Sequence, residues 1–304
     1  MTGGPGAVLV LGEALVDLVP VPGDGGVRAA RFGGAPANVA VGLAGLGTPV
    51  SFAGGLGDDG FAAMIEARLR AAGADLSLCA RSALPTALAV AEPDARGTGY
   101  HFHLQDTATF RLPDLSARTA AFGAVYVGGL AAVVEPAASA VRATALAAAG
   151  RSLLVVDPNV RRDRTLGPDH GAAALRELCG LAQVVKASDE DLERLWPGST
   201  PEETCRELAA GGRLVVLTRG AHGSTAYTAT GPPVSVPARP VEVVDTIGAG
   251  DAFTAGLLSR MCARGSFTAR PGPDEVRDLL SHATDAAASV CACAGTQVSA
   301  PAGT

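Results

Sequence analysis

The sequence of 304 residues contains 24 basic residues but a single lysine, Lys186. A P-loop nucleotide site requires a lysine within Gly-x-x-x-x-Gly-Lys-Ser/Thr, whereas Lys186 stands in Val-Val-Lys-Ala-Ser. A protein kinase requires a lysine on a strand that follows an N-terminal glycine-rich loop, and the sequence lacks that pattern too. These two classes of phosphate-handling protein are therefore excluded.

Charge is also scarce. Charged residues make up 18% of the chain, below the average of about 25%, so we expect no long disordered tails. The 24 basic and 30 acidic residues give a net charge of −6. A nucleic-acid partner would require a basic stripe that the sequence does not offer, so we expect none.

The sequence lacks signs of secretion or membrane insertion. The longest apolar stretch, residues 123–150, is interrupted by Glu135, Pro136 and Arg142, so it predicts no membrane span. No cation precedes Arg28, which argues against a secretory signal. The six cysteines are scattered without a disulfide-like framework. We expect a cytoplasmic protein with reduced thiols and no membrane partner.

Short apolar runs alternate with helical patterns along nearly the whole chain, and 48% of the residues are hydrophobic. The predicted strands are residues 8–11, 49–53, 124–127, 153–156, 184–185 and 214–217, followed by a hairpin-like stretch to residue 244. The predicted helices are residues 38–45, 61–72, 136–149, 172–182, 188–195 and 204–210, with two more starting at Gly250 and Asp274. Repeated β–α units predict one α/β domain over residues 1–304, with a mainly parallel sheet covered on both faces.

Two stretches depart from this alternation. Residues 16–32 are rich in glycine and proline, and residues 86–112 alternate polar and apolar residues as an exposed β-ribbon does. Both follow core strands, where the substrate loops of an α/β sheet lie. We therefore expect them to form a small β lid over a cleft.

The most informative segment is residues 243–256, in which a strand ends at Asp245 and a loop of small residues runs into an apolar helix. The small residues Gly248, Ala249 and Gly250 leave the backbone N–H groups of the helix start open to an anion. A carboxylate there, Asp251, would repel a stored phosphate but could take a proton from an attacking hydroxyl. The segment indicates phosphoryl transfer.

The run Asp245-Thr-Ile-Gly-Ala-Gly-Asp-Ala-Phe253 closely resembles the C-terminal motif of the ribokinase-like (PfkB) carbohydrate kinases. Gly12-Glu-Ala-Leu-Val-Asp17 and Gly33-Gly-Ala-Pro-Ala-Asn-Val-Ala40 resemble the opening segments of fructokinases in that family. Asp157-Pro-Asn-Val-Arg161, Lys186-Ala-Ser-Asp-Glu-Asp-Leu192 and Thr218-Arg-Gly220 follow in the family's order. The resemblance implies a three-layer ribokinase-like fold and ATP-dependent phosphorylation of a small sugar, with fructose as the first choice.

The resemblance also implies roles for individual residues. Asp251 would be the general base, and the N–H groups of Gly248, Ala249 and Gly250 would stabilise the transferred phosphate. Residues implied to hold the sugar are Asp17, Gly33, Gly34, Asn38 and Arg161. Residues implied to line the nucleotide are Lys186, Ser188, Asp191, Thr218, Arg219, Gly220, Gly250 and His282.

The resemblance further implies Mg²⁺ with the nucleotide and a monovalent cation such as K⁺ beside the anion hole. Ser188-x-x-Asp191 stands where the family often has Asn-x-x-Glu near Mg²⁺ and the phosphates. The monovalent-cation set would be Asp245, Ile247, Val290, Cys293, Gly295 and Ser299, mostly through carbonyl oxygens.

Three rival patterns are weaker. Gly55-x-Gly57-x-x-Gly60 fits a dinucleotide fingerprint formally, but Asp58 and Asp59 inside it would repel a pyrophosphate. His101-x-His103 could place two imidazoles on one strand face, without further ligands in evident spacing. Cys291-x-Cys293 likewise lacks a second pair that would complete a metal site.

Several functions stay open at this point. A ribokinase, a 2-keto-3-deoxygluconate kinase and a nucleoside kinase share nearly all of these motifs. A non-catalytic sensor of sugars or nucleotides is the alternative of another class, although Asp251 would have no use in it. We expect the partners to be a small sugar and ATP, with a homodimer through the lid as a further possibility.

Overall fold

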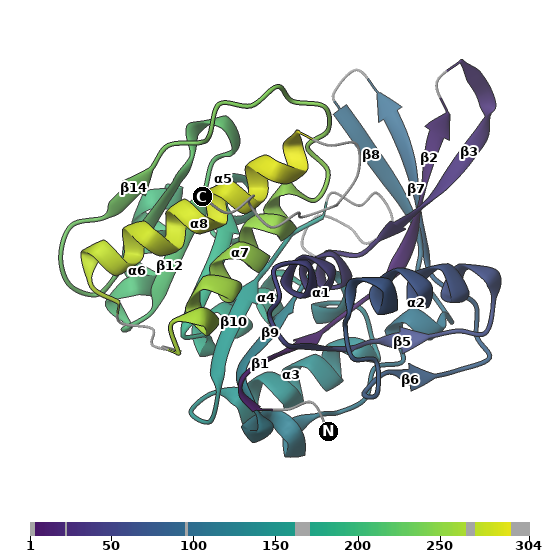
Figure 1. The fold of residues 1–304 in the computed structure, drawn as a ribbon, viewed down its shortest axis with the longest axis horizontal. Coiled ribbons are helices and arrows are strands. Elements are labelled where there is room, and N and C mark those ends of the chain that lie inside the picture. Colours follow the sequence, from purple (N-terminus) through teal and green to yellow (C-terminus); the bar gives the residue numbers. More distant parts are fainter. Residues whose placement is uncertain (1–3, 22, 95–96, 162–170, 266–270, 293–304) are drawn as a thin grey trace.

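The structure is a computed structural model that describes residues 4–21, 23–94, 97–161, 171–265 and 271–292. Its main sheet has eight strands in the order β14-β13-β12-β11-β10-β9-β1-β4 (Figure 1). The parallel strands are β1 (Gly4–Leu11), β4 (Val50–Ala53), β9 (Phe122–Gly128), β10 (Leu153–Asp157), β11 (Val184–Ser188) and β12 (Leu214–Thr218). Two antiparallel strands, β13 (Ser224–Tyr227) and β14 (Val234–Val236), complete one edge.

Helices cover both faces of this sheet. One face packs against α1 (Ala35–Gly45), α2 (Gly60–Ala72), α7 (Ala249–Ala263) and α8 (Pro273–Cys291). The other packs against α3 (Ala137–Ala148), α4 (Ala172–Leu181), α5 (Asp189–Leu195) and α6 (Pro201–Ala210). The strands are apolar on both faces because Val8 and Val10 enter one core while Leu9 and Leu11 enter the other. This is the three-layer α/β arrangement that the sequence predicts.

A second sheet lies beyond the carboxyl end of β1, in the order β3-β2-β7-β8 (Figure 1). Its strands are β2 (Leu15–Val21), β3 (Asp24–Gly33), β7 (Leu88–Asp94) and β8 (Gly97–His103). They fall in the two stretches expected to form a lid, and we call them the small sheet. Short connecting elements are the parallel pair β5 (Gly55–Leu56) and β6 (Ala80–Arg81) and the 3₁₀ turns η1 (Ala108–Phe110), η2 (Ser116–Ala121), η3 (Leu130–Ala132) and η4 (Gly220–His222).

Some element boundaries differ from the prediction for local reasons. Helix α1 begins at Ala35 rather than at 38, because Gly34 has a φ of 99° and Pro36 is suited to a first helical turn. Helix α6 begins at Pro201 rather than at 204, with Thr200 and Glu203 forming a capping box. The hairpin ends at Val236 instead of 244, in a described stretch where prolines at 237 and 240 cannot donate ladder hydrogen bonds.

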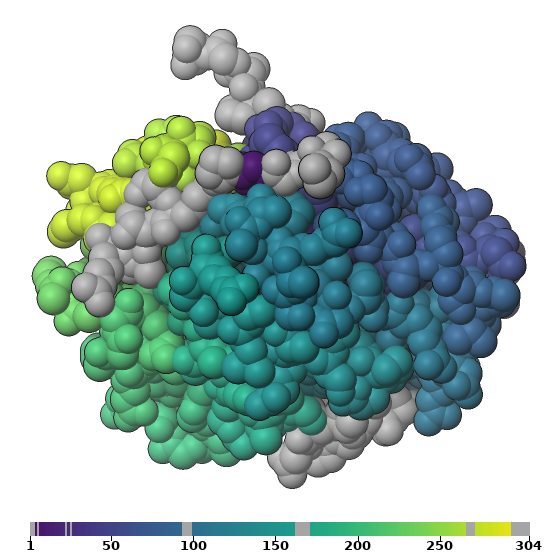
Figure 2. All heavy atoms as spheres, turned by 90° about the horizontal axis from the view of Figure 1, so that it is seen from below, coloured from purple at the N-terminus to yellow at the C-terminus, as the bar shows by residue number. Residues whose placement is uncertain are grey.

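The parallel strands all end at one edge of the main sheet, so the segments that follow β1, β9, β10, β11 and β12 gather there. In the space-filling view, the middle of the sequence (teal) lies between the N-terminal part (blue) and the part that follows it (green), as the strand order requires (Figure 2). Among the residues that the structure describes, no helix combines the length and apolar character needed to cross a membrane.

Candidate active site

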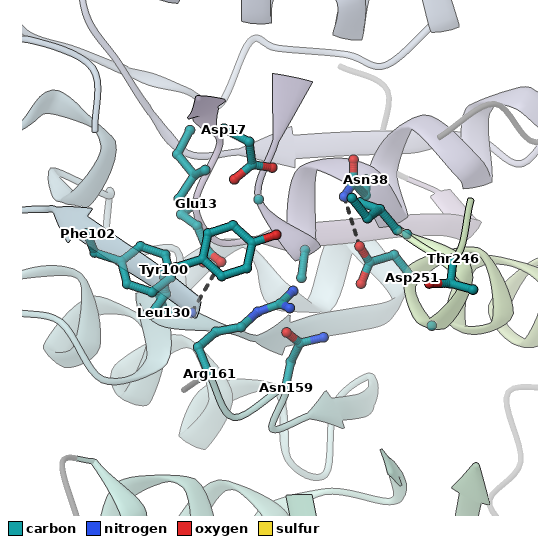
Figure 3. A pocket seen from close by; sticks show the side chains of 16 residues that line it. Glu13, Asp17, Asn38, Tyr100, Phe102, Leu130, Asn159, Arg161, Thr246 and Asp251 are labelled. Atoms are coloured by element: carbon teal, nitrogen blue, oxygen red, sulfur yellow. Dashed lines mark hydrogen bonds between the residues drawn. The ribbon is translucent and has the colours of Figure 1, made fainter. Parts of the chain in front are cut away.

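A pocket of about 290 Å³ opens between the carboxyl edge of the main sheet, the small sheet and the start of α7 (Figure 3). Its walls come from Glu13, Leu15, Asp17, Gly34, Ala35, Asn38, Tyr100, Phe102, Leu130, Asn159, Arg161, Thr246, Ile247, Gly248, Gly250 and Asp251. The sequence motifs around Gly12, Gly33, Asp157 and Asp245 therefore converge on one cavity.

The start of α7 forms one wall. Gly248 caps the helix in the left-handed conformation, with a φ of 81°, which glycine adopts without the strain a Cβ would bring. Asp251 lies in the first helical turn with 4% of its surface exposed. Its Oδ2 accepts a hydrogen bond of 2.8 Å from Asn38 Nδ2. Burial raises the pKa of Asp251, against the opposing influence of Arg161, the Asn38 hydrogen bond and Lys186.

Two more carboxylates lie in the part of the pocket that faces the small sheet. Glu13 follows β1, is 2% exposed, and accepts hydrogen bonds from the backbone N–H groups of Leu130 (3.2 Å) and Ala131 (2.9 Å). Burial raises the pKa of Glu13 to about 7 despite these bonds. Asp17 on β2 is half-buried, and burial raises its pKa to about 6 while Arg161 opposes the rise.

Arg161 follows β10 and extends into the pocket beside Tyr100 (Figure 3). Its backbone is held in place because the preceding N–H, that of Val160, donates to Asp191 Oδ1 at 2.8 Å. Removal from water would lower the pKa of Arg161, but the acidic groups, Asp251 and Glu13 foremost, raise it overall. Among the described residues that line the pocket, one cation thus faces three carboxylates.

Two aromatic side chains of β8 close the pocket from the small sheet. The rings of Tyr100 and Phe102 are stacked with centroids 5.8 Å apart and an interplanar angle of 21°. Successive side chains of a strand alternate between its faces, so His101 and His103 face away from this wall. His101 Nε2 pairs instead with Glu92 Oε2 at 3.1 Å.

Most residues predicted to hold the sugar come together here. Asp17, Gly34, Asn38 and Arg161 line the cavity, and Gly33 lies against Asp17 so closely that a Cβ at Gly33 would overlap its carboxylate. Glu13, Tyr100 and Phe102 were not predicted. The motif around Glu13 was recognised, but the role of the side chain depends on η3, which is distant in sequence.

Four of the residues predicted to line the nucleotide, Ser188, Thr218, Arg219 and Gly220, lie at or just after the carboxyl ends of β11 and β12. Ser188 and Thr218 are register partners on those strands. Arg219 donates from Nη1 to Glu202 Oε1 (2.7 Å) and from Nη2 to Thr225 Oγ1 (2.8 Å), and Gly220 opens η4.

Two members of the nucleotide set are occupied by contacts within the protein. Asp191 Oδ2 accepts from the backbone N–H (2.9 Å) and the hydroxyl (2.7 Å) of Ser188 in a capping box at the start of α5. Lys186 Nζ lies 3.0 Å from Asp157 Oδ2, and both side chains are buried.

The remaining nucleotide residue, His282, lies on α8 where that helix crosses α7 at Gly256. A Cβ at Gly256 would lie 2.8 Å from Ala286 Cβ, so the two helices approach closely. Burial lowers the pKa of His282.

The predicted cation site is described only in part. Asp245 Oδ1 accepts the N–H of Ile247 at 2.9 Å, and the N–H of Val244 donates to the carbonyl of Cys291 at 2.9 Å, at the end of α8 near Val290. Cys293, Gly295 and Ser299 lie outside the described residues. Within the part of the chain that the structure describes, no three His, Cys, Asp or Glu side chains are grouped to hold a metal.

The glycine-rich segment around Gly57 has a structural role. Asp59 caps α2 by accepting the N–H of Ala62 at 2.7 Å, and the same carboxylate accepts the N–H (2.7 Å) and hydroxyl (2.8 Å) of Thr86. A Cβ at Gly55 would collide with the Ala108 carbonyl. The segment is a packed turn, which agrees with rejecting a dinucleotide fingerprint.

A buried aspartate at a glycine-rich helix start, on the carboxyl edge of an α/β sheet, is suited to phosphoryl transfer onto a hydroxyl. The chain belongs to the pfkB family of carbohydrate kinases, whose family model matches residues 6–303. A fructokinase of Rhizobium leguminosarum bv. trifolii is 32% identical over 264 residues, covering 84% of this chain and 79% of the relative.

Solved structures agree with this assignment. A double mutant of the Vibrio cholerae O395 fructokinase, bound to fructose, ADP and a potassium ion, superposes with a TM-score of 0.82 at 27% identity, covering 97% of this chain and 94% of that one. The Xylella fastidiosa fructokinase with bound ATP superposes with a TM-score of 0.79 at 26% identity, covering 96% and 94%. The expected ribokinase-like fold and carbohydrate kinase activity are thereby confirmed.

Proposed function

We propose that the protein transfers the γ-phosphate of ATP to a hydroxyl of a small unphosphorylated sugar, with fructose as the preferred acceptor. The observation that carries this proposal is the buried Asp251 carboxylate, fixed by Asn38 beside the glycine turn that opens α7. Relatives and structural neighbours named as fructokinases support the choice of sugar, and a neighbour with bound ATP supports the phosphate donor.

Each step then has a group to perform it. Asp251 takes the proton of the sugar hydroxyl, whose oxygen forms a bond to the γ-phosphorus while the bond to the bridging oxygen of ADP breaks. The raised pKa of Asp251 makes it a stronger base than an exposed aspartate. The N–H groups of Gly248 and Gly250 stabilise the charge on the transferred phosphoryl group, and that of Ala249 joins them if it leaves the Thr246 carbonyl, to which it donates at 3.2 Å.

In this proposal Asp17, Asn38 and Arg161, with the backbone at Gly33 and Gly34, hold the sugar hydroxyls. Ionised carboxylates accept O–H bonds and an amide both donates and accepts, which suits a polyhydroxylated ligand. The Oδ1 atom of Asn38 is buried and has no hydrogen-bond partner among the described residues, so it is available as an acceptor for a ligand. Glu13 supports this wall from behind through η3, and Tyr100 covers the sugar from the small sheet.

The charges of the pocket favour a neutral acceptor. Among the residues that the structure describes, Glu13, Asp17 and Asp251 share the pocket with one guanidinium, that of Arg161. A phosphorylated or carboxylated sugar would bring another negative charge into this partly desolvated space, where unpaired charge is costly. Fructose is therefore favoured over fructose phosphates and over 2-keto-3-deoxygluconate.

For the nucleotide we propose the residues Ser188, Asp191, Thr218, Arg219, Gly220, Gly250 and His282, with the buried Lys186 beneath them. Mg²⁺ commonly binds through substrate phosphates, waters and one or two carboxylates, so it does not require a cluster of protein ligands. Asp191 could contribute such a carboxylate. Its oxygens already accept hydrogen bonds from Val160 and Ser188, so only their remaining lone pairs could bind Mg²⁺. Mg²⁺ would neutralise charge on the β- and γ-phosphates.

We propose a monovalent cation, K⁺, beside the anion hole. The contact between Val244 and Cys291 brings the Asp245 loop to the last turn of α8, which contains Val290. Cys293, Gly295 and Ser299 come after this helix in the sequence. The potassium ion named in a neighbouring fructokinase structure supports this choice.

We also propose that two copies pair through the small sheet. An apolar groove of about 640 Å³ on that sheet, lined in part by Leu18, Leu88 and Val90, supports a buried contact. Light scattering on the purified protein tests this, since a monomer at micromolar concentration would contradict it.

Because the reaction draws on an ATP pool, we propose the cytoplasm as its location.

The test of the function is ADP release with a panel of acceptors. We expect kcat/KM for fructose to exceed that for ribose, 2-keto-3-deoxygluconate, a nucleoside, fructose 1-phosphate and fructose 6-phosphate. A better rate with another neutral sugar would replace fructose but retain the kinase. Preference for a phosphorylated sugar would refute our interpretation of the pocket, and binding without turnover of any acceptor would favour a sensor.

A further inference from the structure

Beneath the first turn of α7, the main sheet carries two charged side chains that are buried together. Asp157 ends β10 and Lys186 lies on β11, directly beyond the register pairs Val155–Val184 and Val156–Val185. Lys186 Nζ donates to Asp157 Oδ2 at 3.0 Å. The two side chains are 3% and 0% exposed, so this ion pair is screened from water.

A hydroxyl of α7 connects this pair to the active-site turn. Thr254 Oγ1 lies 3.3 Å from Asp157 Oδ2 and 3.1 Å from the carbonyl oxygen of Gly250. Thr254 is fully buried, so water does not compete for these contacts. A hydroxyl carries a single hydrogen and can donate to one of these acceptors at a time. Thr254 thus lies between the sheet and the turn that contains Gly250 and Asp251, and its hydroxyl can donate to either side.

Packing alone does not require polar groups at this place. The rest of the buried surface of α7 is largely apolar, including Phe253, Leu257 and Leu258. Buried ion pairs seldom stabilise a fold more than well-packed apolar residues do. A polar cluster placed directly under the glycine turn therefore suggests a role in the site. Lys186 lies directly beneath Gly250, since a Cβ built at Gly250 would be 3.4 Å from Lys186 Nζ, an ordinary contact distance.

We propose that Thr254 and Asp157, anchored by Lys186, are positioning residues that hold the first turn of α7 in the geometry for phosphoryl transfer. These residues fix the N–H groups at residues 248–250 and the carboxylate of Asp251 relative to β10, the strand that Arg161 follows. This inference rests on the proposed function, because its effect on rate presupposes that Asp251 is the base.

The test compares Thr254→Val, which keeps the shape but removes the hydroxyl, with Thr254→Ser, which keeps the hydroxyl. Small displacements of catalytic groups are costly, so we expect Thr254→Val to lower kcat about tenfold or more, with the KM for the sugar changed about twofold at most. Thr254→Ser should recover most of kcat. Amide exchange of a peptide spanning residues 248–254 should be faster in Thr254→Val than in the wild type or Thr254→Ser.

The matched control is Thr144→Val on α3, across the sheet from the site. Thr144 is a fully buried helical threonine whose hydroxyl accepts the N–H of Leu115 at 3.1 Å. This variant should lower Tm without changing kcat. Should Thr254→Val not fold, Thr254→Ala compared with Thr254→Ser makes the same comparison.

Wild-type kcat in Thr254→Val, or an equal loss of kcat in Thr144→Val, would overturn the positioning role. Unchanged amide exchange at residues 248–254 would overturn it as well. The exchange measurement needs no substrate, so it tests this inference independently of the proposed function. Failure of the proposed function would instead appear as a wild-type protein that phosphorylates no sugar.

Discussion

The buried carboxyl group of Glu13 should make the stability of the protein fall as pH rises. Its pKa moves from 4.5 to about 7 on folding, so between these values the folded state binds more protons than the unfolded state. The free energy of unfolding then decreases with increasing pH. At about 1.4 kcal/mol for each pKa unit, Glu13 alone accounts for a decrease of about 3 kcal/mol.

Glu13→Gln removes this titration. The amide of Gln accepts only through its oxygen, and its NH₂ end would face the other backbone N–H donor, so the variant should lose one of the two hydrogen bonds and be less stable than the wild type near pH of about 5. Between this pH and about 8, above the raised pKa, the stability difference should move in favour of the variant by up to about 3 kcal/mol, because the wild type comes to bury a charge. Urea unfolding followed by the fluorescence of Trp196, the single tryptophan, measures both values.

The matched control is Glu177→Gln, an exposed glutamate paired with Arg142 at 2.6 Å. That ion pair lowers the pKa of Glu177, so Glu177→Gln should be less stable than the wild type at pH values above the ordinary pKa of glutamate. The pH-dependent change in stability relative to the wild type therefore has the opposite sign to that of Glu13→Gln. A stability difference between Glu13→Gln and wild type that stays constant from pH of about 5 to about 8 would refute the argument from burial.

Three further predictions concern catalysis. Asp251→Asn should lower kcat by about 10²-fold or more with ATP binding retained, since general-base catalysis is worth about 10²–10⁴-fold; near-normal kcat would show that Asp251 is not the base. Asp17→Ala should raise the KM for fructose about tenfold or more, because hydrogen bonds to a charged group are lost, with the KM for ATP unchanged; an equal change in both would place Asp17 outside the sugar site. Activity in K⁺ should exceed that in tetramethylammonium at equal ionic strength, and equal rates would remove the cation site.

Much of the fold follows from local sequence patterns. The short apolar runs around Val8, Val125, Leu154 and Val215 predicted strands because a parallel sheet covered on both faces leaves no room for polar alternation. The ends of helices were harder to predict. The start of α1 depends on Pro36 being accepted in a first turn, and that of α6 on the capping box at Thr200.

The candidate site was predictable where one segment carries both the geometry and the chemistry, as around Asp251. It was not predictable where a side chain acts across the fold. Glu13 binds the N–H groups of Leu130 and Ala131 more than a hundred residues away, and Thr254 contacts Asp157 on another element. The alternation of Tyr100 and Phe102 with His101 and His103 was visible in the sequence, but which pair faces the pocket depends on the register of β8.

The burial of Lys186 also gives the protein an unusual chemical property. Reagents that acylate amines find one lysine in this chain, 3% exposed and engaged with Asp157, and its carboxylate partner raises the pKa of the ammonium above its usual value even though burial opposes the rise. A protonated, shielded amine is a poor nucleophile, so the folded protein should be modified essentially at its α-amine. The rate at which Lys186 becomes labelled then reports how often the floor of the active site opens.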